Sequence, residues 1–331
     1  MKSARSNTNS ALRNFSYFTS LATLFLIFVG ALVNSTGSGL SVPDWPLSYG
    51  TLFPSMVGGV FYEHSHRMVA GTVGLLILVL AVWLYREEKR RWVKKLGFTA
   101  LFLVILQGVL GGITVLFFLP HEISICHGIL AQTFFLTTIM IAYTQSEERA
   151  QREKNNEHDL PSGIIKWSVL LLMLVYLQLI IAAIMRHTKS GLAIPDFPTM
   201  GGYYVPPFTA EMLDRINYWR FLENFDPVNM AQVMIHFTHR MMAMMIVIVS
   251  LILTQKVFSV PKGSGIRQSV FLIDLFILFQ IILGISTVLS WKDPYITSFH
   301  VLTGAGILGM SFLLVLRAAP LRLVRFKKLV F

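Results

Sequence analysis

Long uninterrupted runs of apolar residues dominate the chain. A bilayer core of about 30 Å needs roughly 20 apolar residues per helix, and eight stretches of the chain are that long. They lie at residues 15–34, 66–85, 96–118, 124–144, 166–185, 237–255, 269–290 and 298–316. The pattern predicts an all-α integral membrane protein with eight transmembrane helices.

Composition supports this prediction. Of the 331 residues, 54% are hydrophobic and only 14% are charged, and the mean hydropathy is +0.62. A soluble domain of this length would have about a quarter charged residues. The N-terminal segment has no small-residue cleavage site after a short apolar core, so we expect the first helix to be retained. The expected location is the inner membrane of a bacterial cell, as a multi-pass protein surrounded by the lipid bilayer.

The positive charges are distributed unevenly along the chain, which has a formal net charge of +11. The N-terminus, alternate connections and the C-terminal tail hold 21 of the 28 Lys and Arg residues. By the positive-inside rule, these segments and both termini are predicted to be cytoplasmic. The basic excess therefore reflects topology, and nucleic acid is not an expected partner.

The chain contains an internal repeat. SGLSVPDWP at 38–46 recurs as SGLAIPDFP at 190–198, an offset of 152, and EHSHRM at 63–68 recurs as HFTHRM at 236–241, an offset of 173. The difference of 21 predicts one insertion, between about Tyr203 and Pro227. We expect two halves, residues 1–150 and 151–331, each a four-helix bundle. Because each half has an even number of helices, the repeat is parallel, unlike the inverted repeats of many transporters.

Four histidines follow the repeat, and within each pair they are 61 residues apart: His66 and His127, then His239 and His300. Each pair is predicted to join two parallel helices at the same depth, near their outer ends. Two imidazoles from facing helices can hold a heme inside a bundle. A single intramembrane histidine more often hydrogen-bonds a neighbouring helix, but four in register favour metal binding. Zinc prefers four clustered ligands, often thiolates, so heme is the favoured group.

The remaining histidines and the single cysteine have simpler interpretations. His64 is expected at the interface, and His121 and His187 in solvated outer loops. His158 is expected in a cytoplasmic loop. His236 is left open between contact with the second heme and packing against a loop. Cys126 cannot form an intramolecular disulfide and is read as a small buried hydrophobe.

The repeated motif carries a family resemblance. Glu63, His66 and Arg67 form a Glu-x-x-His-Arg motif with His127 as partner, and the second half matches with His239, Arg240 and His300. Over nearly its whole length the chain resembles the heme A synthase family. The resemblance implies oxidation of a methyl group of heme O to the formyl group of heme A for terminal oxidases. It also implies that His66 and His127 bind the substrate heme, while His239 and His300 bind a heme b cofactor that passes electrons.

The resemblance also implies partners. These are heme O as substrate, a heme O synthase that hands it over, a cytochrome oxidase that receives the product, and an electron acceptor that the sequence does not identify. A homo-oligomer is compatible with it. Some family members carry cysteine pairs in outer loops, and this chain does not. The alternative function is a bis-histidine membrane cytochrome b that acts only in electron transfer, with a transporter less favoured.

Glu63 distinguishes the halves, because its counterpart in the repeat is His236. Glu63 shares a helix face with His66 and Arg67. A carboxylate beside a heme can move protons or stabilise positive charge on the oxidised methyl group, so Glu63 is the candidate catalytic residue. The structural alternative is a Glu63–Arg67 helix pair worth a few tenths of a kcal/mol. Arg67 and Arg240 are candidates for binding heme propionates, or need no special role.

Two further motifs are assigned to packing. The repeated loops with Pro and Gly are read as fixed turns that form lids over the heme pockets, or as interfacial anchors through Trp45 and Phe197. Gly108 and Gly112 form a GxxxG pattern that permits close contact between helices, and these glycines are read as packing.

Overall fold

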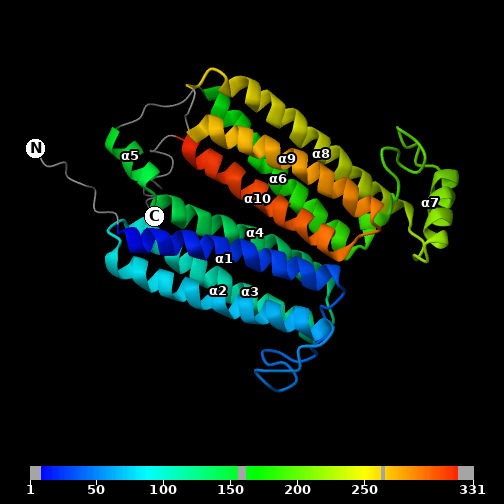
Figure 1. Ribbon diagram of the computed structural model, residues 1–331, viewed down its shortest axis with the longest axis horizontal. Coiled ribbons are helices and arrows are strands. Elements are labelled where there is room, and N and C mark those ends of the chain that lie inside the picture. The colour runs from blue at the N-terminus through cyan, green and yellow to red at the C-terminus, as the bar shows by residue number, and fades with distance from the viewer. Residues whose placement is uncertain (1–8, 156–161, 262–264, 320–331) are drawn as a thin grey trace, which may run out of the picture.

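The computed structural model describes residues 9–155, 162–261 and 265–319, which fold as a bundle of long helices (Figure 1). The helices are α1 (Ser10–Ser35), α2 (Gly59–Glu87), α3 (Arg91–Leu116), α4 (His121–Thr144), α5 (Glu147–Asn155), α6 (Ser162–His187), η1 (Ser190–Leu192), α7 (Ala210–Leu222), α8 (Met230–Val257), α9 (Gly265–Leu289) and α10 (Pro294–Ala318).

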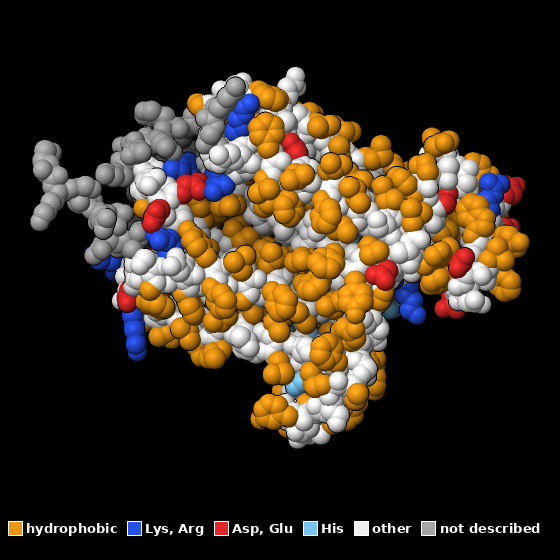
Figure 2. Space-filling model, in the orientation of Figure 1, with side chains coloured by type: hydrophobic (Ala, Val, Ile, Leu, Met, Phe, Trp, Pro, Cys, Tyr) orange, Lys and Arg blue, Asp and Glu red, His pale blue; other side chains and the backbone are white. Residues whose placement is uncertain are grey.

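Eight of these helices are long and apolar enough to cross a membrane: α1, α2, α3, α4, α6, α8, α9 and α10. This confirms the predicted all-α membrane class and the number of spans. Figure 2 shows hydrophobic side chains covering the middle of the bundle, with most charged side chains gathered towards its two ends. The protein is a multi-pass membrane protein.

The spanning helices pack as two rings of four. In the first ring each of α1, α2, α3 and α4 packs against two neighbours, so α2 and α4 are diagonally opposite. In the second ring the order is α6, α8, α9 and α10, so α8 and α10 are diagonally opposite. The rings meet where α10 packs on α1 and α4, and α4 packs on α6. The predicted boundary at residue 150 falls within α5, between the two rings.

The two ends of the bundle differ. One end, here called the loop end, carries the connections at 36–58 and 188–229, and the other carries α5 (Figure 1). The start of α1 and the end of α10 both lie at the α5 end, where Arg317 of α10 pairs with Glu148 of α5 at 2.7 Å. The cytoplasmic location of this end stays a prediction of the charge distribution. His158 lies outside the described residues.

Two features of the helices differ from the sequence prediction. Helices α2 and α8 begin at Gly59 and Met230, each seven residues before the predicted start. Their first turns carry polar residues that bond to the loops instead of facing lipid, so an apolar run underestimates these helices. The predicted insertion contains a helix, α7, that the sequence pattern did not predict, because it is short and has no long apolar run.

Candidate heme sites

The two SGL-x-x-PD-x-P loops at the loop end have the same hydrogen bonds. The Asp44 carboxylate accepts bonds from the backbone N–H groups of Tyr49 (2.7 Å) and Gly50 (2.8 Å). Asp196 accepts the equivalent bonds 152 residues further on, at 2.8 and 2.9 Å. The N–H groups of Gly50 and then Tyr49 hold the pKa of Asp44 below its ordinary value. The charged carboxylates therefore fix both turns.

One arginine fastens each loop to the helix that follows it. Arg67 of α2 donates to the carbonyl oxygens of Asp44 (2.6 Å), Leu47 (2.5 Å) and Val42 (3.1 Å). Arg240 of α8 donates to the equivalent carbonyls of the second loop. Those acceptors are Ile194 at 2.9 Å, Asp196 at 3.0 Å and Thr199 at 3.3 Å. Both guanidinium groups are thus engaged by the loops, which is a structural role independent of any propionate.

Glu63 and His236 make the same contact in the two halves. The buried Glu63 carboxylate accepts a bond from the backbone N–H of Val42 (2.8 Å) and one from Arg67 (2.6 Å). In the second half the buried His236 ring accepts through Nδ1 from the N–H of Ile194 at 3.1 Å. His236 therefore packs against its loop, one of the two interpretations left open by the sequence. Glu63 does the same and adds a negative charge.

The four repeat histidines point across the two rings from diagonally opposite helices. His66 is on α2 and His127 on α4, and their imidazole rings are close enough to interact electrostatically. The ring centres of His239 on α8 and His300 on α10 are 6.5 Å apart. All four lie six to nine residues from the first residue of their helices, which is roughly 9–14 Å along the axis. The structure therefore brings each predicted pair together at one depth.

The spacing of the second pair suits one metal ion between two imidazoles. With metal–nitrogen bonds of about 2.0–2.1 Å, as histidine forms with zinc, two such rings on opposite sides of an ion have centres roughly 6 Å apart. The observed 6.5 Å between the rings of His239 and His300 is close to that value. Their planes are tilted by 59°, which bis-imidazole ligation tolerates because each ring binds through a single nitrogen.

Glycines on neighbouring helices make room for three of the rings. A Cβ atom at Gly30 of α1 would lie 3.1 Å from Cε1 of His66, and one at Gly284 of α9 would lie 3.1 Å from Cε1 of His300. A Cβ atom at Gly111 of α3, the counterpart of Gly284 in the repeat, would lie 3.5 Å from Cε1 of His127. A Cβ atom at Gly30 or Gly284 would press on the imidazole ring beside it, whereas one at Gly111 would make an ordinary van der Waals contact.

One ring nitrogen of each repeat histidine has no protein partner among the described residues. The Nδ1 atoms of all four are buried, and among the described residues none has a hydrogen-bond partner. Buried polar atoms are nearly always paired, so an unpaired one calls for an explanation such as a ligand. No group of three or more His, Cys, Asp or Glu side chains within the described residues could hold a metal ion. A metal bound at these histidines therefore has two protein ligands in each half, which fits heme.

In each half, a glutamine from the preceding helix holds the backbone of the second histidine of the pair. Gln107 of α3 donates to the carbonyl of His127 at 3.0 Å. Gln280 of α9 donates to the carbonyl of His300 at 3.0 Å, and its amide nitrogen lies 3.4 Å from Nε2 of that ring. The two glutamines are counterparts at the offset of 173.

A third glutamine appears in the second half only. Gln178 of α6 donates to the carbonyl of His239 at 3.0 Å, and its amide nitrogen lies 3.3 Å from Nε2 of the ring. At the offset of 152 its counterpart is Leu26, which cannot form either contact with His66. The second pair is therefore held by amides on both sides, and the first pair on one side.

Four side chains are placed differently from the sequence interpretation. His64 is not interfacial: it is buried, and its Nδ1 lies 2.8 Å from the hydroxyl of Ser48, because the first loop folds back over that side of α2. Cys126 is exposed on α4 and is not a buried hydrophobe, because the neighbouring His127 takes the inward position. His121 and His187 are the terminal residues of α4 and α6 and not loop residues.

The two glycines of the GxxxG pattern do not lie in a contact between helices. Gly108 has no atom near its missing side chain, and a Cβ at Gly112 would lie 2.8 Å from the ring of Trp45. The glycine at 112 therefore lets the first loop, not another helix, pack closely on α3. Trp45 and Phe197 are both partly exposed, as anchoring residues would be.

A surface pocket at the loop end is separate from the histidines. Its volume is about 310 Å³, and it is lined by Pro195, Asp196, Trp219, Leu222, Glu223 and Trp291. None of the four repeat histidines lines it, so it does not define the heme sites.

Comparison with known proteins gives the family. The cytochrome oxidase assembly protein family matches residues 13–59 and 56–313, and the chain belongs to this family. It is 28% identical over 304 residues to a heme A synthase of Halalkalibacterium halodurans, covering 88% of this chain and 92% of that one. It is 31% identical over 192 residues to a heme A synthase of Bacillus licheniformis, covering 57% of this chain and 63% of that one. A heme A synthase of Lysinibacillus sphaericus is 32% identical over 194 residues, covering 57% and 62%.

Proposed function

We propose that this bacterial membrane protein is a heme A synthase, which oxidises a methyl group of heme O to the formyl group of heme A. The observation that carries the proposal is the family match across both rings, together with two histidine pairs whose buried Nδ1 atoms have no partner among the described residues. Relatives named heme A synthase align with most of the chain.

The two pairs are assigned different hemes. His66 and His127 would hold the substrate heme, and His239 and His300 would hold a resident heme b. The support is the uneven amide contact: Gln178 restrains His239, whereas Leu26 occupies the equivalent place beside His66. A resident cofactor benefits from rigid ligands, because outer contacts that orient ligating histidines strengthen binding of the metal. A substrate must leave after reaction.

Bound heme supplies the redox chemistry of its iron. The residues of the chain do the rest: histidines orient the two groups, glycines give the rings their space, and the fastened loops restrict water at the loop end. Proton movement and stabilisation of positive charge fall to Glu63. Fastening a loop does not need a carboxylate, because His236 performs the same task without one. The property peculiar to Glu63 is therefore its negative charge, and we assign it to the oxidation step.

Further partners follow from the reaction. Heme O would come from a heme O synthase and heme A would pass to a cytochrome oxidase, each through the membrane. An external acceptor would take the electrons that leave the methyl carbon. A homo-oligomer is compatible with the lipid-facing surface.

Extraction and mass analysis of the pigments tests the proposed function directly. The purified protein should carry heme B together with heme O, heme A or the intermediate alcohol. Heme B alone, in protein made by cells that contain heme O, would instead support a cytochrome b that only transfers electrons.

A further inference from the structure

Two cations at the loop end of the second ring have no partner. Arg186 lies in the last turn of α6, and Lys292 lies in the turn between α9 and α10. Among the described residues, neither side chain forms a hydrogen bond or an ion pair. Arg186 is half-buried at the end of a membrane-spanning helix, and Lys292 is exposed in the turn beside it. An Arg at the end of a spanning helix often pairs with an anion or marks a functional site, so an anion that both side chains can reach would lie at the loop-end surface.

The two cations lie close together and close to a heme-ligand histidine. The positive charge of Arg186 acts on both Lys292 and the ring of His300. Burial, then Arg186 and Arg220, lower the pKa of Lys292 below its ordinary value. His300 is six residues into α10, roughly 9 Å from its start, so the cations lie on the loop-end side of the ring.

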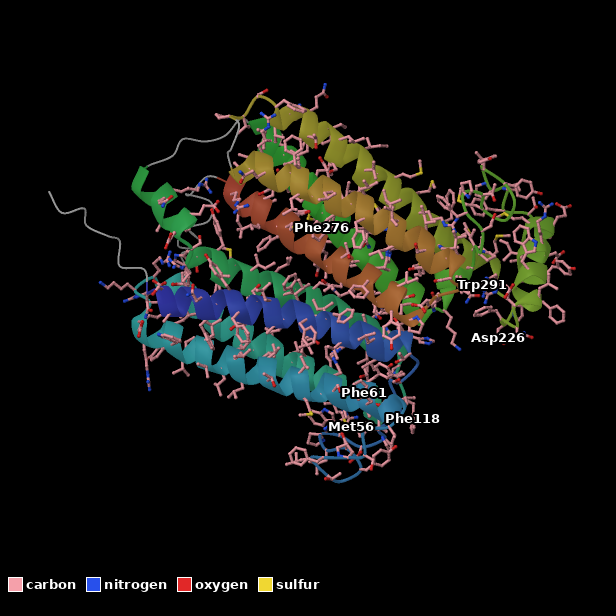
Figure 3. All side chains as sticks on the ribbon, viewed as in Figure 1. Met56, Phe61, Phe118, Asp226, Phe276 and Trp291 are labelled. Atoms are coloured by element: carbon pink, nitrogen blue, oxygen red, sulfur yellow. The ribbon has the colours of Figure 1, made fainter. Side chains whose placement is uncertain are left out.

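The insertion brings the third cation of this group. Arg220 of α7 is buried and donates to the carbonyls of Leu192 (2.7 Å) and Asp226 (2.9 Å), so it is already engaged. Phe225 stacks on Trp291 with ring centres 5.2 Å apart. Figure 3 shows Trp291 at the loop end of the second ring, facing the insertion that carries Asp226. The insertion thus covers the turn that holds Lys292.

The first half has the same backbone positions without the charges. The counterparts of Arg186 and Lys292 are Asn34 and Leu119. The Leu119 side chain lies 3.5 Å from the Cβ position of Gly39, and the Lys292 side chain lies 3.8 Å from that of Gly191, the counterpart of Gly39. The same cradle is therefore neutral in one half and doubly positive in the other.

We propose that Arg186 and Lys292 form a carboxylate site for the propionate groups of the heme held by His239 and His300. The proposal rests on the proposed function, because it assumes a heme in the second half. Arginine offers a planar fork that fits a carboxylate, and lysine adds a point charge. Arg67 and Arg240, which the sequence made candidates for this task, are engaged by loop carbonyls. The phosphate of a lipid headgroup has similar chemistry, and the test must separate the two.

The test uses the full-length protein in nanodiscs of phosphatidylcholine, with His66→Ala to confine heme b to the second half. Binding of heme b is compared with binding of its dimethyl ester, which keeps the ring and iron but has no carboxylates. The free acid should bind at least about tenfold more tightly, because hydrogen bonds to charged groups contribute that much. In Arg186→Gln/Lys292→Gln the preference should vanish while the ester binds as before. The control is Arg215→Gln, an exposed α7 arginine that lies over Tyr203, which should keep the preference.

Each contrary result has its own meaning. Equal binding of acid and ester in the His66→Ala protein, or a preference that survives the double substitution, overturns the carboxylate site. Nanodiscs that contain phosphatidylglycerol separate the two sources of anion. If the double substitution removes the stabilisation by this lipid but leaves the preference for the free acid, the cations bind lipid phosphate and the proposal is wrong. If neither form of heme binds, the heme b assignment itself fails, and the carboxylate site fails with it.

Discussion

The two rings share one frame and differ in the residues that surround each histidine pair. The Asp-fixed turn, the arginine that fastens the loop, and the glutamine that holds the last histidine occur in both. The first ring adds a carboxylate at position 63. The second adds Gln178, Arg186 and Lys292. Under the proposed function, the added charge of the first ring serves the oxidation and the added contacts of the second ring serve retention of heme b.

This comparison separates structural roles from functional ones. A contact found in both rings, such as that of Arg67 and Arg240 with their loops, belongs to the shared frame. A residue that differs at an equivalent position, while its neighbours keep their geometry, points to a task of that ring alone. Glu63 against His236 and Lys292 against Leu119 are differences of the second kind.

The largest effect is expected from removing a ligand of the second ring. His239→Ala or His300→Ala should weaken heme b binding at least about a hundredfold, because loss of contacts to a ligating histidine alone costs 10–100-fold. The measurement is the b-type absorbance of the purified, reduced protein. His64→Ala, which removes a buried histidine outside the pairs, is the control. Full b-type absorbance in both ligand variants would remove the basis of the comparison.

The next effect concerns the charge of the first ring. Glu63→Gln can still accept the Val42 hydrogen bond but carries no charge, so heme A output should fall at least about a hundredfold, the usual scale of proton-transfer catalysis. The b-type spectrum should persist. His236→Gln, the same replacement at the equivalent position, should reduce output far less. Output is measured as heme A per cell and as the heme O that accumulates. Similar output from both variants would make Glu63 a loop fastener only.

Much of the architecture shared by the two rings was predictable from sequence, because it depends on sequence patterns that occur in both halves. Apolar runs predicted the eight spans, and the repeat predicted which histidines meet, since equal spacing places them on equivalent helix faces. The starts of α2 and α8 were missed because their polar first turns bond to loops. His64 was misplaced because helical phase alone cannot show a loop folding back over a helix.

Contacts between distant segments were not predictable. Gln178 comes from a helix whose register against α8 is set only by packing, and Arg186 and Lys292 are 106 positions apart in the sequence. A signal did exist for these residues in the repeat: Leu26, Asn34 and Leu119 are their counterparts. A position-by-position comparison of the halves would have shown polar or charged residues on one side only.

A smaller effect should distinguish the two loop fasteners. Arg67→Ala leaves the buried Glu63 carboxylate without its ion pair, which costs about 3–5 kcal/mol of folding free energy. Arg240→Ala leaves unpaired carbonyls but no charge, at about 1–3 kcal/mol. The apparent melting temperature of the detergent-solubilised protein should therefore fall more for Arg67→Ala. Arg67→Ala/Glu63→Gln should recover part of the difference. Equal melting temperatures for the two single variants would mean that the Glu63 charge is compensated elsewhere.

The smallest effect should come from the amide that only the second ring has. Gln178→Leu copies the first-ring residue and removes the donor to the His239 carbonyl, a loss of about 1 kcal/mol. Heme b should then dissociate about fivefold faster into a heme-scavenging protein. The reverse change, Leu26→Gln, should slow loss of heme from the first ring, because position 26 of α1 is equivalent to position 178 of α6 in the repeat. Together the two variants test whether retention of heme is the task of the second ring. If the rate of heme b release is unchanged in Gln178→Leu, this amide contributes to packing alone. The difference in retention must then come from the cations at the loop end.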